Sequence, residues 1–127
     1  MIILAVDYGE SRVGLAYGDT AVRVALPRGV VQGGENAAEN VASVAREISA
    51  QKIIIGMPRY ADGNEHFLSA SVEEFGNFLE AALSIPVIYV DERFSSQAAD
   101  RFGGAGGASR DERSAMILLD DFFSAES

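Results

Sequence analysis

Two apolar segments near the N-terminus constrain the fold of this chain more than any other feature of its sequence. Residues 2–6 form an unbroken apolar run, which is typical of a central strand covered on both faces. A second apolar run, over residues 13–18, follows after a link of only 7–12. Strands joined by so short a link must be antiparallel neighbours, and Gly9 gives the link the backbone freedom it needs.

The pattern that follows predicts an α/β sheet. A third strand is expected over residues 23–31, where Pro27 cannot donate to a sheet ladder and therefore indicates an edge or bulged strand. Alternating helical and apolar segments then predict helices over about 36–50 and 68–82 and strands over 52–56 and 87–90. We expect a five-stranded mixed sheet, with its first three strands antiparallel and helices on both faces.

The C-terminal part of the chain adds helices but no further strand. Ser95 or Ser96 could cap a short helix that runs through about Phe102, and a glycine-rich loop follows. Ser109 is the predicted N-cap of the last helix, with Glu112 as its capping-box partner. No shift in composition marks a boundary, so residues 1–127 are expected to form a single domain.

Composition limits the chemistry of any site. The chain has no cysteine and one histidine, His66, which excludes disulfides and thiolate metal sites and makes zinc a poor fit. A metal site would therefore need oxygen ligands, which favours Mg²⁺, Mn²⁺ or Ca²⁺. No apolar run approaches the ~20 residues of a membrane span, and the N-terminus lacks a basic leader, so a cytoplasmic protein without a membrane partner is expected.

The charged residues give two opposing indications about nucleic-acid binding. A net charge of −9 argues against binding nucleic acid by bulk electrostatics. The cations, however, are almost all arginines, whose planar guanidinium suits bidentate phosphate contacts, although each could equally form an ordinary surface ion pair. Those in or beside the predicted site loops are Arg12, Arg59, Arg93, Arg101, Arg110 and Arg113. The candidates for substrate binding among them are Arg12, Arg59, Arg93 and Arg110.

Carboxylates follow the predicted strands at the edge where sites form in α/β sheets. Converging carboxylates repel one another unless they are protonated or neutralised, and Mg²⁺ or Mn²⁺ neutralises them. Two such ions about 3.5–4 Å apart can clamp the attacking water and the leaving oxygen of a phosphodiester. Asp7 and Glu92 are candidates at strand ends, Asp91 is a further one, and either Asp111 or Glu112 could contribute from the last helix.

Each carboxylate also has a structural alternative. Asp7 could pair with Arg12, and Glu92 could be a solvated strand end beside Arg93. Asp111 and Glu112 lie in the first turn of a helix, where the helix dipole stabilises any carboxylate, and helical spacing does not choose between them.

The ordered set of motifs resembles the YqgF/RuvX family over essentially the whole chain. The matching motifs are Val6-Asp7-Tyr8-Gly9, Arg12-Val13-Gly14-Leu15-Ala16, Gly56-Met57-Pro58 with Asp62-Gly63, Asp91-Glu92-Arg93-Phe94-Ser95-Ser96, and Asp111 with Ser114-Ala115 and Ile117-Leu118-Leu119. The resemblance implies an RNase H-like fold and a metal-dependent nuclease that processes the 5′ end of pre-16S ribosomal RNA in ribosome biogenesis. It places the acidic catalytic residues, which are also the Mg²⁺ or Mn²⁺ ligands, at Asp7, Glu92 and Asp111.

Three other functions stay open at this point. One is a nuclease that resolves Holliday junctions, which would ordinarily need a symmetric dimer, whereas the sequence shows no dimer face and fits a monomer or weak homodimer. Another is a non-catalytic module that binds RNA or ribosome-assembly factors, because residues 102–110 replace the longer basic segment usual in the family. The third is a nucleotide-binding ATPase of the actin type, for which this chain has room for one lobe only.

Overall fold

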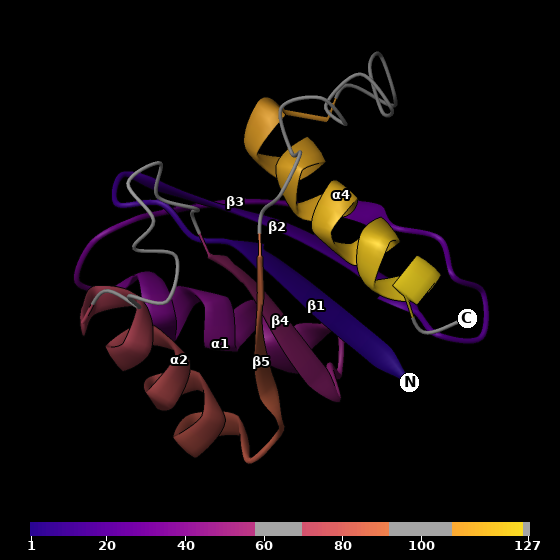
Figure 1. Cartoon of the computed structure of the whole chain (residues 1–127). Helices are drawn as coiled ribbons and strands as arrows, with labels where there is room; N and C mark the ends of the chain where they lie inside the picture. The colour runs from indigo at the N-terminus through magenta and orange to yellow at the C-terminus, as the bar shows by residue number, and fades with distance from the viewer. Residues whose placement is uncertain (58–69, 92–107, 126–127) are drawn as a thin grey trace.

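The central feature of the fold is a single five-stranded sheet with helices on both of its faces (Figure 1). The computed structural model describes residues 1–57, 70–91 and 108–125. The strands are β1 (Ile2–Asp7), β2 (Arg12–Asp19), β3 (Leu26–Gln32), β4 (Lys52–Met57) and β5 (Val87–Asp91). The helices are α1 (Ala37–Glu47), α2 (Ala70–Leu83) and α4 (Arg110–Ala125).

The strand order is β3-β2-β1-β4-β5, which confirms the predicted topology. The pairs β1/β2 and β2/β3 are antiparallel, and the pairs β1/β4 and β4/β5 are parallel. This arrangement follows from the connections, because short links join the first three strands and a helix precedes each of the last two. The helix predicted to begin at Ser95 or Ser96 lies outside the described residues.

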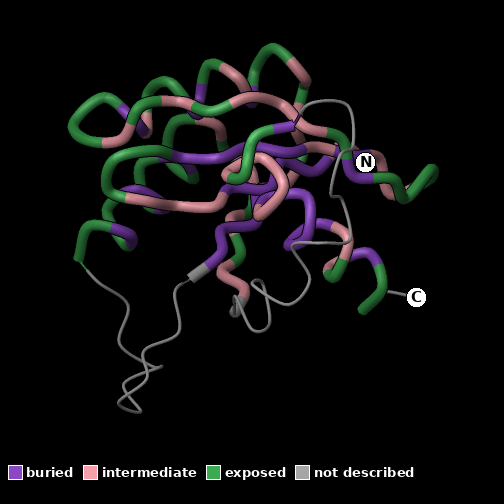
Figure 2. Tube along the Cα trace, turned by 90° about the horizontal axis from the view of Figure 1, so that it is seen from above, coloured by how far each residue is buried: buried purple, intermediate pink, exposed green. Residues whose placement is uncertain are grey.

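Alternation along the strands divides the core between the two faces. Leu4 and Val6 of β1 pack with α1 and α2, whereas Ile3 and Ala5 pack with α4. Ile54 of β4 likewise faces α4, between neighbours that face the other way. Because both faces are covered, the central strands are buried along their length, as the apolar run at 2–6 predicted (Figure 2).

Small residues on β2 form the surface against which α4 packs. Gly14, Ala16 and Gly18 occupy alternate positions on the α4 face of the sheet, while the larger Val13 and Leu15 pack on the opposite face. A Cβ added at Gly14 would lie 2.1 Å from the backbone oxygen of Asp111, and one at Gly18 would lie 3.1 Å from the Phe123 ring. The glycines therefore let the helix approach the strand more closely than side chains would allow.

The third strand starts later than its sequence suggested. Arg23 has a φ of +63° and its backbone N–H donates to the Asp19 carbonyl at 2.7 Å, so the chain is still in the turn after β2 at residue 23. The strand begins at Leu26, lies at the sheet edge, and its register with β2 shifts between Gly14 and Ala16. The edge position and the irregularity that Pro27 predicted are thus both confirmed.

Within the three described stretches of the chain, no helix combines the length and the apolar character needed to cross a membrane.

Candidate active site at the end of β1

Asp7 ends the central strand between two residues without side chains. Its register partners are Gly14 of β2 and Gly56 of β4. The alternation of β1 places Asp7 on the same face as Ile3 and Ala5, which is the face that α4 covers. The residue is half-buried. The sheet thus presents one carboxylate, flanked by glycines, toward the start of α4.

The first turn of α4 brings Asp111 to the same place. A Cβ at Gly14 would lie 2.1 Å from the Asp111 backbone oxygen and 2.9 Å from its Cβ, so Asp111 lies directly against Gly14. Gly14 is also the cross-strand partner of Asp7. Asp7 and Asp111, 104 positions apart in the sequence, are therefore both neighbours of a single glycine.

Glu112, the other candidate in this turn, has a structural task instead. Its carboxylate accepts the Ser109 backbone N–H at 2.9 Å, while its own N–H donates to the Ser109 hydroxyl at 3.2 Å, which is the predicted capping box. It also accepts the Gly29 N–H of the edge strand at 2.7 Å. The backbone hydrogen bond from Ser109, with a further one from Gly29, lowers the pKa of Glu112. Tertiary packing therefore distinguishes Asp111 from Glu112, which helical spacing alone could not do.

Arg12 pairs with Asp111. Its Nε lies 3.0 Å from Asp111 Oδ2, and the two side chains are 72% and 28% exposed respectively. The sequence had offered Arg12 as a partner for Asp7, which lies on the adjacent strand. The structure pairs this cation with the carboxylate of Asp111 on α4.

The other predicted site residues are less fully placed. Arg110 is the first residue of α4 and is exposed, one position before Asp111. Asp91 ends β5 in register with Met57, and Glu92 follows it in the sequence. Glu92, Arg59 and Arg93 lie outside the described residues, so their predicted roles stay predictions.

A metal ion would find oxygen donors at this site. Asp7 and Asp111 are carboxylates, the ligand type that Mg²⁺ and Mn²⁺ prefer, and no cysteine exists in the chain. Among residues 1–57, 70–91 and 108–125, no group of three or more histidine, cysteine or acidic residues is placed to hold a metal. The donor set therefore fits Mg²⁺ or Mn²⁺ in kind, and the third predicted ligand is Glu92.

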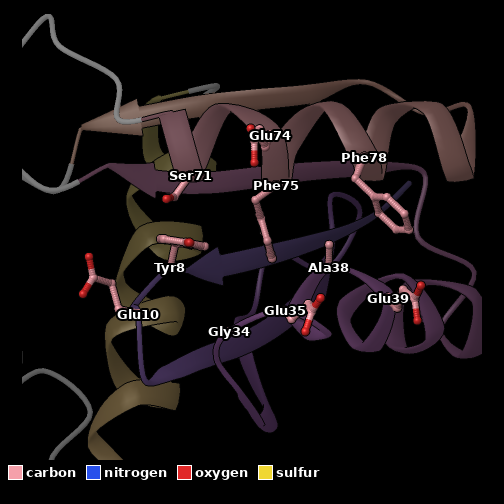
Figure 3. A pocket seen from close by; sticks show the side chains of 10 residues that line it. All are labelled: Tyr8, Glu10, Gly34, Glu35, Ala38, Glu39, Ser71, Glu74, Phe75 and Phe78. Carbon is pink, nitrogen blue, oxygen red and sulfur yellow. The ribbon is translucent and has the colours of Figure 1, made fainter.

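The opposite face of the sheet carries a groove that the sequence analysis did not identify (Figure 3). Tyr8, the residue after Asp7, lies on the α1/α2 side of the sheet. Its ring packs edge to face against that of Phe75, with 4.9 Å between the ring centroids. The groove has a volume of about 500 Å³ and is lined by Tyr8, Glu10, Gly34, Glu35, Ala38, Glu39, Ser71, Glu74, Phe75 and Phe78. Its lining thus combines four carboxylates and three aromatic rings with no cation.

Residues 1–125 match the model of the RuvX family, which is described as "Holliday junction resolvase". A relative from Paraburkholderia xenovorans is 33% identical over 125 residues, which cover 94% of this chain and 86% of the relative. That protein is named "Putative pre-16S rRNA nuclease".

Solved structures confirm the predicted RNase H-like fold. The RuvC protein of Thermus thermophilus, determined with a Holliday junction substrate, matches with a TM-score of 0.66 and 16% identity over 99% of this chain and 95% of that one. A ROK hexokinase from the same organism matches with a TM-score of 0.54 and 23% identity over 83% of this chain but only 38% of the kinase. At these identities the likeness shows the fold alone.

Proposed function

The chain belongs to the RuvX family, and from this membership we propose that it is a nuclease that hydrolyses phosphodiester bonds at the site formed by Asp7 and Asp111. The observation that carries the proposal is the position of Gly14. This glycine is the sheet partner of Asp7 and lies against Asp111, so two of the three predicted acidic residues neighbour the same glycine, which supports the proposal.

The third acidic residue of the proposed site is Glu92, which follows β5 in the sequence. Together, Asp7, Glu92 and Asp111 would hold Mg²⁺ or Mn²⁺. Bound there, the metal would activate water and stabilise the charge that develops on the phosphate. Asp7 is suited to fixing the geometry, because it is the last residue of the central strand and is bonded in register on both sides.

The proposed substrate-binding groups are the arginines Arg12, Arg59, Arg93 and Arg110. Arg12 and Arg110 support this role because both lie beside Asp111 and both are exposed. Since the protein carries a net charge of −9, these local cations, rather than the overall field, would have to attract a phosphate backbone. A guanidinium can bind phosphate through two parallel hydrogen bonds, which orients the substrate as well as holding it.

The proposed substrate is the 5′ end of pre-16S ribosomal RNA, in the cytoplasm and as part of ribosome biogenesis. The name of the Paraburkholderia relative supports this choice over a DNA junction. The family description supports the alternative substrate, a Holliday junction. Ribosome-assembly factors are proposed partners under the first alternative only.

The test offers both substrates to the purified protein. Labelled 5′-extended 16S precursor RNA and a labelled four-way DNA junction are each incubated with Mg²⁺, Mn²⁺ or EDTA, beside the Asp7→Asn variant. We expect metal-dependent cleavage of the RNA that the variant lacks. Cleavage of the junction alone would replace rRNA with DNA as the substrate, and equal activity of the variant would overturn the assignment of the site.

A further inference from the structure

The contact between Arg12 and Asp111 places a cation where the proposed site needs a free carboxylate. Arg12 Nε lies 3.0 Å from Asp111 Oδ2. Arg12 contacts one oxygen of the Asp111 carboxylate, and a divalent cation bound to the same carboxylate would lie close to the guanidinium, so the two positive charges would repel each other. The side chain of Asp111 therefore cannot serve both partners fully at once.

The ion pair is weak enough to be exchanged. The Arg12 side chain is 72% exposed, and a solvent-exposed ion pair changes an equilibrium constant by no more than about fivefold. Metal coordination by more than one carboxylate is stronger than a single exposed pair, because each added carboxylate contributes charge and a ligand atom. A divalent cation at the site would consequently displace Arg12 from Asp111 at a modest loss of affinity.

The backbone of Arg12 is held in the sheet, while its side chain is largely exposed to solvent. Arg12 pairs with Gln32 of β3, and the neighbouring Ser11 carbonyl accepts the Gly33 N–H at 2.8 Å. A displaced guanidinium would therefore stay tethered at the rim of the site. It would also be unpaired there, with the planar donor geometry that suits a phosphate.

We propose that Arg12 is an exchange residue, which neutralises Asp111 while no metal is bound and is released by the cation to bind the substrate phosphate. The first half concerns metal affinity alone, and the second half rests on the proposed nuclease function. The exchange links metal binding to substrate binding, because the protein that has bound its cation also has a released guanidinium beside the site.

The test measures Mn²⁺ binding by calorimetry on the full chain, without nucleic acid, for wild type, Arg12→Gln and Arg28→Gln. Arg28 is a matched control because it forms an ion pair with Glu47 at 2.5 Å and its loss changes the net charge equally. We expect Arg12→Gln to bind Mn²⁺ about two- to fivefold more tightly than Arg28→Gln. Arg12→Lys, which keeps the charge, should return the affinity toward that of wild type.

Cleavage of the precursor RNA at saturating Mn²⁺ supplies the second readout. Arg12→Gln should cleave more slowly than Arg28→Gln and show a higher KM, although it binds the cation more tightly. Mn²⁺ affinity equal to or weaker than that of Arg28→Gln would overturn the exchange, as would the absence of Mn²⁺ binding in wild type and Arg12→Gln alike. Tighter Mn²⁺ binding with no cleavage by any form would leave the displacement standing and overturn the nuclease function.

Discussion

Asp7 and Tyr8 are consecutive residues, yet they lie on opposite faces of the sheet. The surroundings of the two residues are also built differently. On the α4 face, Asp7 lies between glycines, and the backbone of α4 contacts Gly14. On the α1/α2 face, Tyr8 borders a groove made of aromatic rings and carboxylates (Figure 3). The close approach of two backbones forms the first environment, and the packing of side chains forms the second.

This difference between the two faces predicts where the protein should tolerate amino-acid substitutions. A backbone carbonyl cannot be displaced without moving the helix that carries it, whereas the end of a side chain can turn aside at low cost. We therefore expect substitutions at the Asp7 face to impair cleavage strongly, and substitutions around the groove to have small effects.

The largest effect is expected from Asp7→Asn. The amide keeps the shape of the side chain but removes the charge that the proposed metal requires. Metal ions supply several kcal/mol of charge stabilisation to such reactions, so cleavage of labelled precursor RNA should fall by at least about 100-fold. Thermal unfolding should show an intact fold, and retention of more than a tenth of the wild-type rate would contradict the role of Asp7.

The second prediction compares Gly14→Ala with Gly76→Ala, one glycine from each face. A Cβ at Gly14 meets the Asp111 backbone oxygen at 2.1 Å, so the first turn of α4 must shift, at a cost of about 1–3 kcal/mol in unfolding free energy. A Cβ at Gly76 would meet the hydroxyl of Tyr89 and lie 2.8 Å from the ring carbon Cζ, so the tyrosine ring, and not a backbone, must turn aside, while alanine favours the helix by about 1 kcal/mol.

Chemical denaturation of the two glycine variants measures this contrast. Gly14→Ala should be destabilised and lose cleavage, whereas Gly76→Ala should stay within about 1 kcal/mol of wild type and cleave normally. Equal destabilisation of both variants would show that the two faces do not differ in the way the structure indicates.

The third prediction concerns the hydrogen bonds that hold the first turn of α4 in place. Glu112→Ala removes acceptors for the Ser109 and Gly29 N–H groups and should lower the free energy of unfolding by about 1 kcal/mol at pH 7. The folded-state pKa of Glu112 lies below its ordinary value of 4.5. Its stabilisation is therefore complete above pH 4.5 and is lost as the pH falls through the lowered folded value.

Unfolding of wild type and Glu112→Ala between pH 7 and pH 3 measures that dependence. The difference between the two proteins should be constant from pH 7 to about pH 5 and should narrow below pH 4.5. A difference that grows on acidification would have the wrong sign for a carboxylate whose pKa is lowered.

The smallest effect is expected from Glu74→Gln in the groove. Removing one of four like charges from an exposed surface should change the free energy of unfolding by less than about 0.5 kcal/mol. The rate of RNA cleavage should stay within about twofold of wild type, because the groove lies on the face opposite Asp7. A loss of tenfold or more would connect the groove to the site and remove the contrast between the faces.

Much of the fold could be predicted from the sequence because its signals are local. The apolar run at 2–6 predicted the central strand, Pro27 predicted the irregular edge strand, and the Ser109–Glu112 pair predicted the start of the last helix. Each of these depends on residues within a few positions of one another. The start of β3 was misplaced because the turn continues through Arg23, whose positive φ has no clear local signal.

The sequence by itself determined that this chain forms a mixed sheet with an acidic residue at the end of its central strand, because hydrophobic periodicity and turn residues act over short distances. The tertiary structure decided which acidic residue of α4 lies against Gly14, the sheet partner of Asp7. Helical spacing left Asp111 and Glu112 equivalent, and the choice depends on contacts more than 80 positions away, with Gly14 for one and Gly29 for the other. Only packing creates such contacts, since they depend on how closely α4 can approach β2 and β3.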